Sequence, residues 1–217
     1  MNPSLLFFIS GIAGAYFLGS IPSSVWIGRV FFGVDVREHG SGNAGASNTL
    51  RVLGKPAGIS VLAIDFLKGL AATSIAFFQY NAEPDTTAFR NIQMVFAIFA
   101  VFGHVYPIFV GFKGGKGIAT LWGSTVGISW KVSVLCLIVF VLIVWITRYI
   151  SLGSMIGCLA SPFFVWFIYG PEEKFLIYYC ILVGLLAIYT HRTNIGRLRN
   201  GTETKFGFNK KAEISRR

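Results

Sequence analysis

The chain has 217 residues, of which 54% are hydrophobic and only 13% charged, so it is too apolar for an ordinary soluble domain. Its net charge of +10 suits anionic lipid headgroups and phosphate-bearing substrates. Seven spans of ~20 residues would use most of this length. We therefore expect one integral membrane domain over residues 1–217, with a basic tail at about 191–217.

Apolar runs bounded by Gly, Pro or charge follow one another along the chain, at residues 5–27, 57–80, 92–110, 118–130, 132–146, 152–169 and 175–189. In lipid such runs must be helices, because only internal hydrogen bonds satisfy the backbone. The sequence therefore predicts an all-α, polytopic membrane protein with seven transmembrane helices. The fourth and fifth runs are short, so six and eight spans are the competing counts.

The basic residues indicate the orientation of these spans. Four follow the first run, two the third and one the fifth, and eight lie in the tail, whereas only Arg90, Lys131 and Lys174 fall on the opposite face. Because cytoplasmic connections carry the excess of Lys and Arg, we expect the N-terminus outside and the C-terminus in the cytoplasm. The three cysteines lie inside apolar runs, so we expect buried free thiols and no metal site.

The first basic connection, at residues 37–51, is rich in glycine. Its glycines formally match a dinucleotide fingerprint, but an apolar span precedes them and no βαβ unit follows. Small residues let backbone N–H groups turn toward an anion, and Arg51 adds a two-pronged donor. We predict a phosphate site with Ser41, Asn43 and Arg51. Taken alone, the segment is more often a flexible loop whose arginines fix topology.

The second basic connection reads Gly-Phe-Lys-Gly-Gly-Lys-Gly at residues 111–117 and opens into a predicted span. It departs from a Walker P-loop, since Gly117 stands where Ser or Thr would hold magnesium. Amide donors, the helix dipole and two ammonium groups nevertheless favour phosphate. We predict phosphate binding here, with a purely topogenic turn as the alternative; the residues are Gly111, Lys113, Gly114, Gly115, Lys116 and Gly117.

A third polar segment follows the last run, with His191 and Asn194 three residues apart. On a helical end they share one face, which suggests a proton acceptor beside an amide donor for an oxyanion. Taken alone, an interfacial cap before a basic, lipid-binding tail is the commoner explanation.

Several polar residues lie inside or beside the runs. Asp65 and Lys68 are expected to form a structural pair, because a charge at a helix centre costs ~3 kcal/mol and the two are three residues apart. We expect His104 to be a packing histidine. Ser151 and Ser154 would add hydroxyl donors to the cavity that the three polar segments share on the cytoplasmic face.

These motifs, taken in order, resemble those of the bacterial acyl-phosphate-dependent glycerol-3-phosphate acyltransferases. Gly-Ser-Gly-Asn with Ala-Ser-Asn-Thr-Leu-Arg is similar to the first family motif, Gly-His-Val-Tyr-Pro with Phe-Lys-Gly-Gly-Lys-Gly to the second, and His-Arg-Thr-Asn-Ile to the third. Asp-Phe-Leu-Lys-Gly at residues 65–69 also agrees. The resemblance covers nearly the whole chain, and three motifs in this order are highly specific.

The resemblance implies transfer of an acyl group from acyl phosphate to glycerol 3-phosphate, giving 1-acyl-glycerol 3-phosphate (lysophosphatidic acid) as the first step of bacterial phospholipid synthesis. It implies a multi-pass enzyme of the inner membrane with a cytoplasmic active site and no cofactor or metal. The implied partners are the two substrates, membrane lipids and the soluble enzyme that makes acyl phosphate, and nucleic acid is not among them. It assigns essential roles to Ser41 and Arg51, importance for activity to His191 and Asn194, and a structural role to Glu203.

Chemistry suggests how these residues divide the work. Arg51 and Lys116 neutralise phosphates, Ser41 and Asn194 donate to an oxyanion or orient a phosphate, and His191 or a substrate phosphate accepts the hydroxyl proton. A covalent acyl-serine on Ser41 ranks lower, because no His-Asp pair adjoins it in the sequence. A phosphate-ester transporter is the main rival function, and a lipid-binding scaffold is the third.

Overall fold

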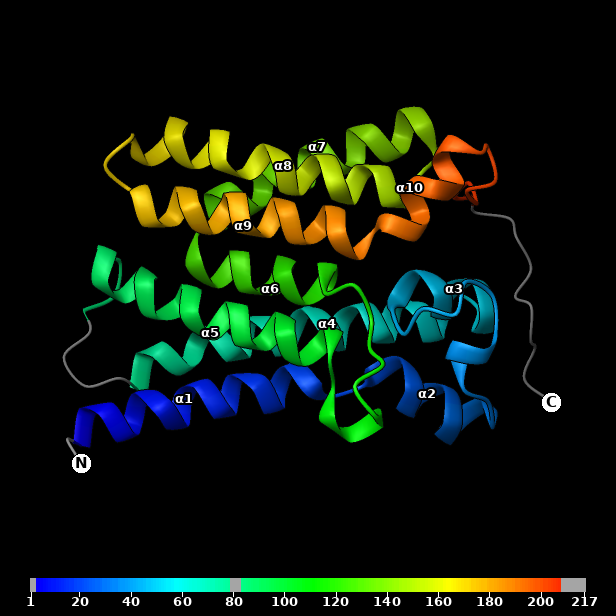
Figure 1. Cartoon of the computed structure of the whole chain (residues 1–217), viewed down its shortest axis with the longest axis horizontal. Coiled ribbons are helices and arrows are strands. Elements are labelled where there is room, and N and C mark those ends of the chain that lie inside the picture. The colour runs from blue at the N-terminus through cyan, green and yellow to red at the C-terminus, as the bar shows by residue number, and fades with distance from the viewer. Residues whose placement is uncertain (1–2, 79–82, 208–217) are drawn as a thin grey trace. The chain divides into compact units, whose positions relative to one another are not determined.

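The computed structural model describes residues 3–78 and 83–207, in which helices alternate with loops and no strand is present (Figure 1). The chain forms two compact units, the first holding the described residues up to Ile128 and the second beginning at Ser129. The prediction of an all-α protein is therefore confirmed for the described ranges.

The first unit contains six α-helices and three short 3₁₀ turns. In chain order they are α1 Pro3–Ser20, α2 Ser23–Phe32, η1 Val36–Glu38, α3 Ala46–Leu53, α4 Lys55–Ser74, η2 Ile75–Phe78, α5 Thr87–Val105, η3 Ile108–Val110 and α6 Ile118–Ile128. Helix α4 packs against both α1 and α6, and α1 packs along α5. The two glycine-rich loops predicted to bind phosphate lie between α2 and α3 and between α5 and α6.

A proline breaks the first span between α1 and α2, and buried polar residues of α4 stabilise the break. Pro22 has no N–H to continue the helix. Lys68 Nζ donates to the Ile21 carbonyl over 2.8 Å, and Ser23 Oγ donates to Asp65 Oδ1 over 2.7 Å. Lys68 and Asp65 form the predicted ion pair at 2.9 Å, with side chains 3% and 1% exposed. Each end of the break therefore has a charged partner, which supports a structural role for the pair.

Helices α4 and α6 approach each other closely because glycine lies at their contact. A Cβ at Gly69 would overlap the Thr120 carbonyl oxygen, and one at Gly123 would overlap the Phe66 carbonyl oxygen. Small residues of this kind let membrane helices pack backbone to backbone. The contact fixes α6, and with it the position at which the second glycine-rich loop enters a helix.

The second unit is built from four helices, α7 Trp130–Thr147, α8 Ile150–Tyr169, α9 Lys174–Thr190 and α10 Arg192–Arg199. Helix α8 packs against both α7 and α9. The chain bends by 60° between α9 and α10 at His191. Arg148 joins α7 to α8 in the left-handed conformation, and its carbonyl accepts from the Phe206 N–H.

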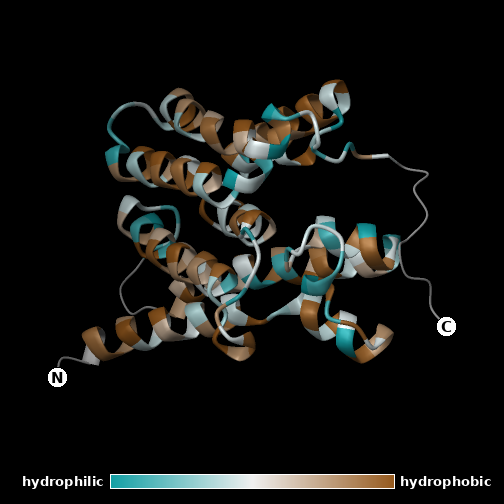
Figure 2. Ribbon diagram, turned by 45° about the vertical axis from the view of Figure 1, so that its right-hand side comes forward, coloured by the Kyte–Doolittle hydropathy of each residue, from teal (hydrophilic) through white to brown (hydrophobic). Residues whose placement is uncertain are grey.

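Within residues 3–78 and 83–207, five helical segments are long and apolar enough to cross a membrane, and a sixth is added if the bent pair α9 and α10 is one span. They are Leu5–Phe32, Lys55–Phe78, Thr87–Val110, Trp130–Thr147 and Ile150–Tyr169, while α6, at 11 residues, is a shorter apolar helix. Large apolar side chains such as Phe17, Trp145 and Phe167 are exposed along these helices, as a lipid-facing surface requires. Figure 2 shows hydrophobic residues, coloured brown, along the long helices. The last two residues of the predicted second run, 79–80, lie outside the described residues.

Candidate functional site

One buried side chain, Asn48 at the start of α3, organises the first glycine-rich loop. Its Nδ2 donates to the carbonyl oxygens of Val36 (2.8 Å) and His39 (3.1 Å). Its Oδ1 accepts from the backbone N–H of Ser41 (2.8 Å) and from Ser41 Oγ (3.0 Å). An amide can donate and accept at once, so Asn48 closes the loop on both sides and fixes Ser41.

The partner of Ser41 defines what its hydroxyl can do. Ser41 Oγ donates its only hydrogen to an amide oxygen, which is not a base, so this contact does not activate Ser41 as a nucleophile. Its oxygen keeps lone pairs that can accept a hydrogen bond. This geometry agrees with the expectation that a covalent acyl-serine on Ser41 is less favourable than direct acyl transfer.

Arg51 lies on α3 next to this loop and is partly exposed. A Cβ built on Gly40 would lie 3.5 Å from Arg51 Cδ, so the Arg51 side chain runs beside the residue that precedes Ser41. Among the described residues, no hydrogen bond or ion pair is found for its guanidinium. A partly buried cation without a protein partner, beside a glycine loop, is suited to bind an anion.

The second glycine-rich loop runs back along the end of α5. The N–H groups of Gly114 and Gly115 donate to the carbonyl oxygens of Val105 (3.1 Å) and His104 (3.2 Å). These two amides are therefore occupied inside the protein, unlike the phosphate-binding amides expected from the sequence. Lys113 is exposed and Lys116 is partly exposed.

Gly115 also brings the two loops into contact. A Cβ at this position would overlap His104 Nε2 and lie 2.6 Å from the Ala44 carbonyl oxygen of the first loop. No larger residue can occupy this position unless its neighbours move. The glycine is required here for close approach of the two loops, which is a different reason from the anion contact expected from the sequence.

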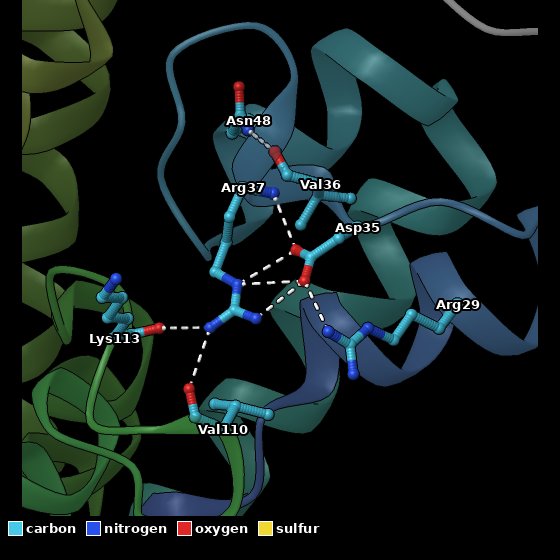
Figure 3. Close-up of polar contacts among 7 residues, drawn as sticks. All are labelled: Arg29, Asp35, Val36, Arg37, Asn48, Val110 and Lys113. Carbon is cyan, nitrogen blue, oxygen red and sulfur yellow. Dashed lines mark hydrogen bonds and ion pairs between the residues drawn. The ribbon is translucent and has the colours of Figure 1, made fainter.

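Arg37 joins the same two loops through hydrogen bonds (Figure 3). Its Nε and Nη2 donate to the Asp35 carboxylate, with Nη2 2.7 Å from Oδ2. Its Nη1 donates to the carbonyl oxygens of Val110 (3.0 Å) and Lys113 (3.2 Å). The hydrogen bonds from Arg37 lower the pKa of Asp35 from 3.8 to about 2 against the opposing effect of burial, so Asp35 is ionised at neutral pH.

A buried polar network lies below these loops. His104 Nδ1 is 3.6 Å from Asp65 Oδ1 and 3.1 Å from Thr120 Oγ1 at the first turn of α6. His104, Asp65 and Lys68 line a cavity of about the size of one water molecule, which also contacts Gly114 and Gly115. This cavity is too small for a glycerol phosphate, and its residues support the loops from beneath.

In the second unit, the Glu203 carboxylate binds three side chains, of which Ser151 and Asn194 were predicted as site residues and Arg197 was not. Its Oε1 accepts from Ser151 Oγ of α8 and from Asn194 Nδ2 of α10, each over 2.6 Å. Its Oε2 forms an ion pair with Arg197 Nε at 2.8 Å. Burial raises the pKa of Glu203, but the hydrogen bonds from Ser151, Arg197 and Asn194 outweigh burial and leave this pKa below 4.5.

His191, between α9 and α10, is 2% exposed, and its Nδ1 lies 2.8 Å from the Ala187 carbonyl oxygen. Because a carbonyl only accepts, Nδ1 carries the hydrogen, and in the neutral ring Nε2 carries the lone pair. Ser154 Oγ donates to the Ile150 carbonyl. The hydroxyl hydrogens of Ser151 and Ser154 are thus both used inside the protein, which leaves only their oxygen lone pairs for a ligand.

Sequence reasoning missed Asp35, Arg37 and Asn48. The spacing Asp-Val-Arg carried a usable signal, because residues two apart at a turn can form a forked ion pair. Asn48 gave no signal of its own, since its partners lie 7 to 12 residues away in the chain. Within the described ranges, no group of three or more His, Cys, Asp or Glu side chains could hold a metal ion.

Comparisons with known proteins agree along nearly the whole chain. The family model described as glycerol-3-phosphate acyltransferase matches residues 9–201. Glycerol-3-phosphate acyltransferase from Bacillus cereus (strain G9842) is 43% identical over 198 residues, which cover 91% of this chain and 94% of that protein. The enzyme of the same name from Fusobacterium nucleatum is 38% identical over 201 residues, with 93% and 99% covered.

Two solved structures are also similar to this chain. Both are of PlsY (YgiH), described as an integral membrane glycerol 3-phosphate acyltransferase. The glycerol 3-phosphate form is 37% identical with a TM-score of 0.81 and covers 95% of this chain and 96% of that one. The lysophosphatidic acid form is 36% identical with a TM-score of 0.78, with 92% and 95% covered.

Proposed function

The chain belongs to the glycerol-3-phosphate acyltransferase family, and from this membership we propose that its acyl donor is acyl phosphate and its product 1-acyl-glycerol 3-phosphate. It is an integral membrane acyltransferase that acts on glycerol 3-phosphate and serves phospholipid synthesis. The enzyme assignment replaces the transporter and scaffold alternatives.

One observation carries the choice of donor: two basic glycine-rich loops meet in the first unit, where Arg51 has no partner among the described side chains. Two phosphate-bearing substrates require such a concentration of cations. A donor activated by coenzyme A is disfavoured by the sequence. Acyltransferases of that class use a His with an Asp five positions later, and His39, His104 and His191 all lack such an Asp.

The proposed reaction is a direct acyl transfer. The primary hydroxyl oxygen of glycerol 3-phosphate attacks the carbonyl carbon of acyl phosphate, the new ester C–O bond forms, and the bond from that carbon to the phosphate oxygen breaks. Inorganic phosphate leaves, and the hydroxyl proton passes to an acceptor. Because acyl phosphate is a mixed anhydride, positioning and charge neutralisation are the main tasks left to the protein.

The residues divide these tasks. We assign phosphate neutralisation to Arg51 and Lys116, with Asn43, Lys113 and the glycines of the second loop beside them. His191 is supported as a proton acceptor by the tautomer that the Ala187 carbonyl imposes, with a substrate phosphate as the competing acceptor. Asn194 Nδ2 donates to Glu203, which orients the amide that we assign to the oxyanion.

We also propose seven crossings, with the N-terminus outside and the active site on the cytoplasmic face of the bacterial inner membrane. The excess of basic residues in the connections and the tail supports this orientation. Helix α6 spans only ~16 Å, so a crossing of about 30 Å also needs the loop residues that lead into it. The family match at residues 9–201 extends over both compact units, which supports one enzymatic domain.

The decisive test is an assay of the purified full chain in lipid with glycerol 3-phosphate and either acyl phosphate or acyl-coenzyme A. We expect lysophosphatidic acid from acyl phosphate, with one inorganic phosphate released per product. The Lys116→Ala variant is expected to lose affinity for glycerol 3-phosphate. An equal rate from the thioester would contradict the proposed donor. The soluble enzyme that makes acyl phosphate is the expected supplier of this substrate.

A further inference from the structure

We propose that Asp35 and Arg37 are positioning residues that hold the second glycine-rich loop in the shape that binds glycerol 3-phosphate. The inference rests on the proposed function of that loop. Neither residue belongs to the motif set identified from the sequence, and neither need touch a substrate to act in this way.

The donors of the Arg37 guanidinium are shared between the Asp35 carboxylate and two backbone carbonyls. Asp35 receives Nε and Nη2 as well as the backbone N–H of Arg37, so the side chain is fixed in one orientation. Nη1 is thereby directed at the Val110 and Lys113 carbonyl oxygens (Figure 3). A planar fork can satisfy a carboxylate and two carbonyls together, whereas an ammonium group has no such geometry.

The segment between those two carbonyls has an unusual backbone conformation. Gly111 and Phe112 both lie in the left-handed region, with φ of +70° and +59°. For a bulky residue such as Phe112 this conformation is strained and persists only where surrounding contacts impose it. The bonds from Arg37 lie on each side of the strained pair, and Phe112 N–H donates to the Pro107 carbonyl over 2.9 Å. Arg37 therefore holds this turn against relaxation.

This turn leads directly into the residues assigned to phosphate binding. Lys113 directly follows the strained pair, and Gly114, Gly115 and Lys116 come next. If the turn relaxed, the lysine ammonium groups would lose their placement while their charges stayed. The expected defect is therefore weaker binding of glycerol 3-phosphate, with little change in the chemical step.

Arg29 offers a matched control. Its Nη2 binds the same Asp35 carboxylate at 2.9 Å, but its side chain is 58% exposed, against 20% for Arg37. Within the described residues, the Arg29 side chain makes no hydrogen bond to either glycine-rich loop. Arg29→Ala therefore removes one cation from Asp35 without removing the link between the loops.

The test uses the full-length protein in lipid bilayers and measures kcat and both KM values. We expect Arg37→Ala and Arg37→Lys to raise KM for glycerol 3-phosphate by about tenfold or more, with kcat and KM for acyl phosphate within about twofold of the parent. Arg29→Ala should stay within about twofold in all three. Asp35→Asn alone should raise KM for glycerol 3-phosphate. In the Arg37→Ala background it should raise this KM little further, because Asp35 acts through Arg37.

A second measurement is independent of activity. Hydrogen exchange at the Phe112 amide should become faster by about tenfold in Arg37→Ala and stay unchanged in Arg29→Ala. Unchanged exchange, or equal KM values for Arg37→Ala and Arg29→Ala, would overturn the inference. The inference would also be overturned if kcat of the variants fell in proportion to their thermal stability, because that result indicates a structural role alone. A parent protein that does not acylate glycerol 3-phosphate would instead contradict the proposed function, and the exchange experiment would still decide the role of Arg37.

Discussion

Two arginines beside the first glycine-rich loop differ in what balances their charge. Arg37 is bound by Asp35 and by backbone carbonyls, whereas Arg51 lacks a hydrogen-bonding partner among the described residues. A guanidinium bound on several sides is a structural fastener, and one without a partner is available to a ligand. Residue type and charge alone do not separate these two roles.

At the residue scale, we predict that Arg51→Lys loses ten- to a hundredfold in turnover although the charge is kept. A guanidinium can bind two phosphate oxygens at once, and a charge-assisted contact is worth ~1.5 to 3 kcal/mol. Steady-state kcat and KM for both substrates provide the measurement. Parent-like kinetics in Arg51→Lys, combined with failure of Arg51→Ala, would show that Arg51 acts only as a general charge.

Glycine positions in the second loop allow a paired prediction at the same scale. Gly115→Ala places a Cβ against His104 Nε2 and the Ala44 carbonyl, and such overpacking costs ~1 to 3 kcal/mol. Gly111→Ala has nothing within 4 Å of the new Cβ and pays only for its left-handed φ of +70°, at ~1 kcal/mol. Thermal unfolding in detergent should rank Gly115→Ala as the less stable variant. The reverse order would mean that the two loops readily move apart.

At the scale of elements, Glu203 ties the segment after α10 to two helices. Ser151 comes from α8, and Asn194 and Arg197 come from α10. The same contact orients Asn194, a candidate for the reaction itself. A single carboxylate therefore couples the position of a predicted functional amide to the packing of the second unit.

We predict a pH-dependent stability difference between the parent and Glu203→Gln. Because the pKa of Glu203 is lowered in the folded protein, its stabilising contribution is complete above about pH 4.5 and is lost as the pH falls through the folded value. The melting temperature of Glu203→Gln should be roughly 3 to 10 °C lower at pH 7. Melting curves from pH 7 downward should show this gap closing below about pH 4.5. A gap that is constant with pH would rule out the charge as its cause.

At the scale of the whole molecule, the charge distribution defines the expected sidedness. A membrane-impermeant maleimide is expected to label Glu172→Cys in intact cells, and to label Lys55→Cys only after the membrane is opened. Both positions are exposed. The background carries Ser at Cys136, Cys158 and Cys180, which are free thiols in the second unit. Labelling of Lys55→Cys from outside would reverse the proposed orientation.

The sequence by itself determined the membrane class, the helical fold and the family, because apolar length and ordered motifs are local properties of the chain. It also gave the Asp65 and Lys68 pair, since three-residue spacing on a helix brings side chains together. The break inside the first span is the clearest local miss: the predicted run 5–27 was continuous, whereas Pro22 divides the segment Leu5–Phe32 into α1 and α2.

Only the tertiary structure decided which polar groups already have partners. The amides of Gly114 and Gly115 are bound to the end of α5, Ser151 donates to Glu203, and Arg37 links two loops about 75 residues apart in the chain. Hydrogen bonds between segments distant in sequence depend on how helices pack, and no local pattern encodes their pairing. Motif reading therefore found the residues of the candidate site, and packing decided which of them are free to meet a substrate.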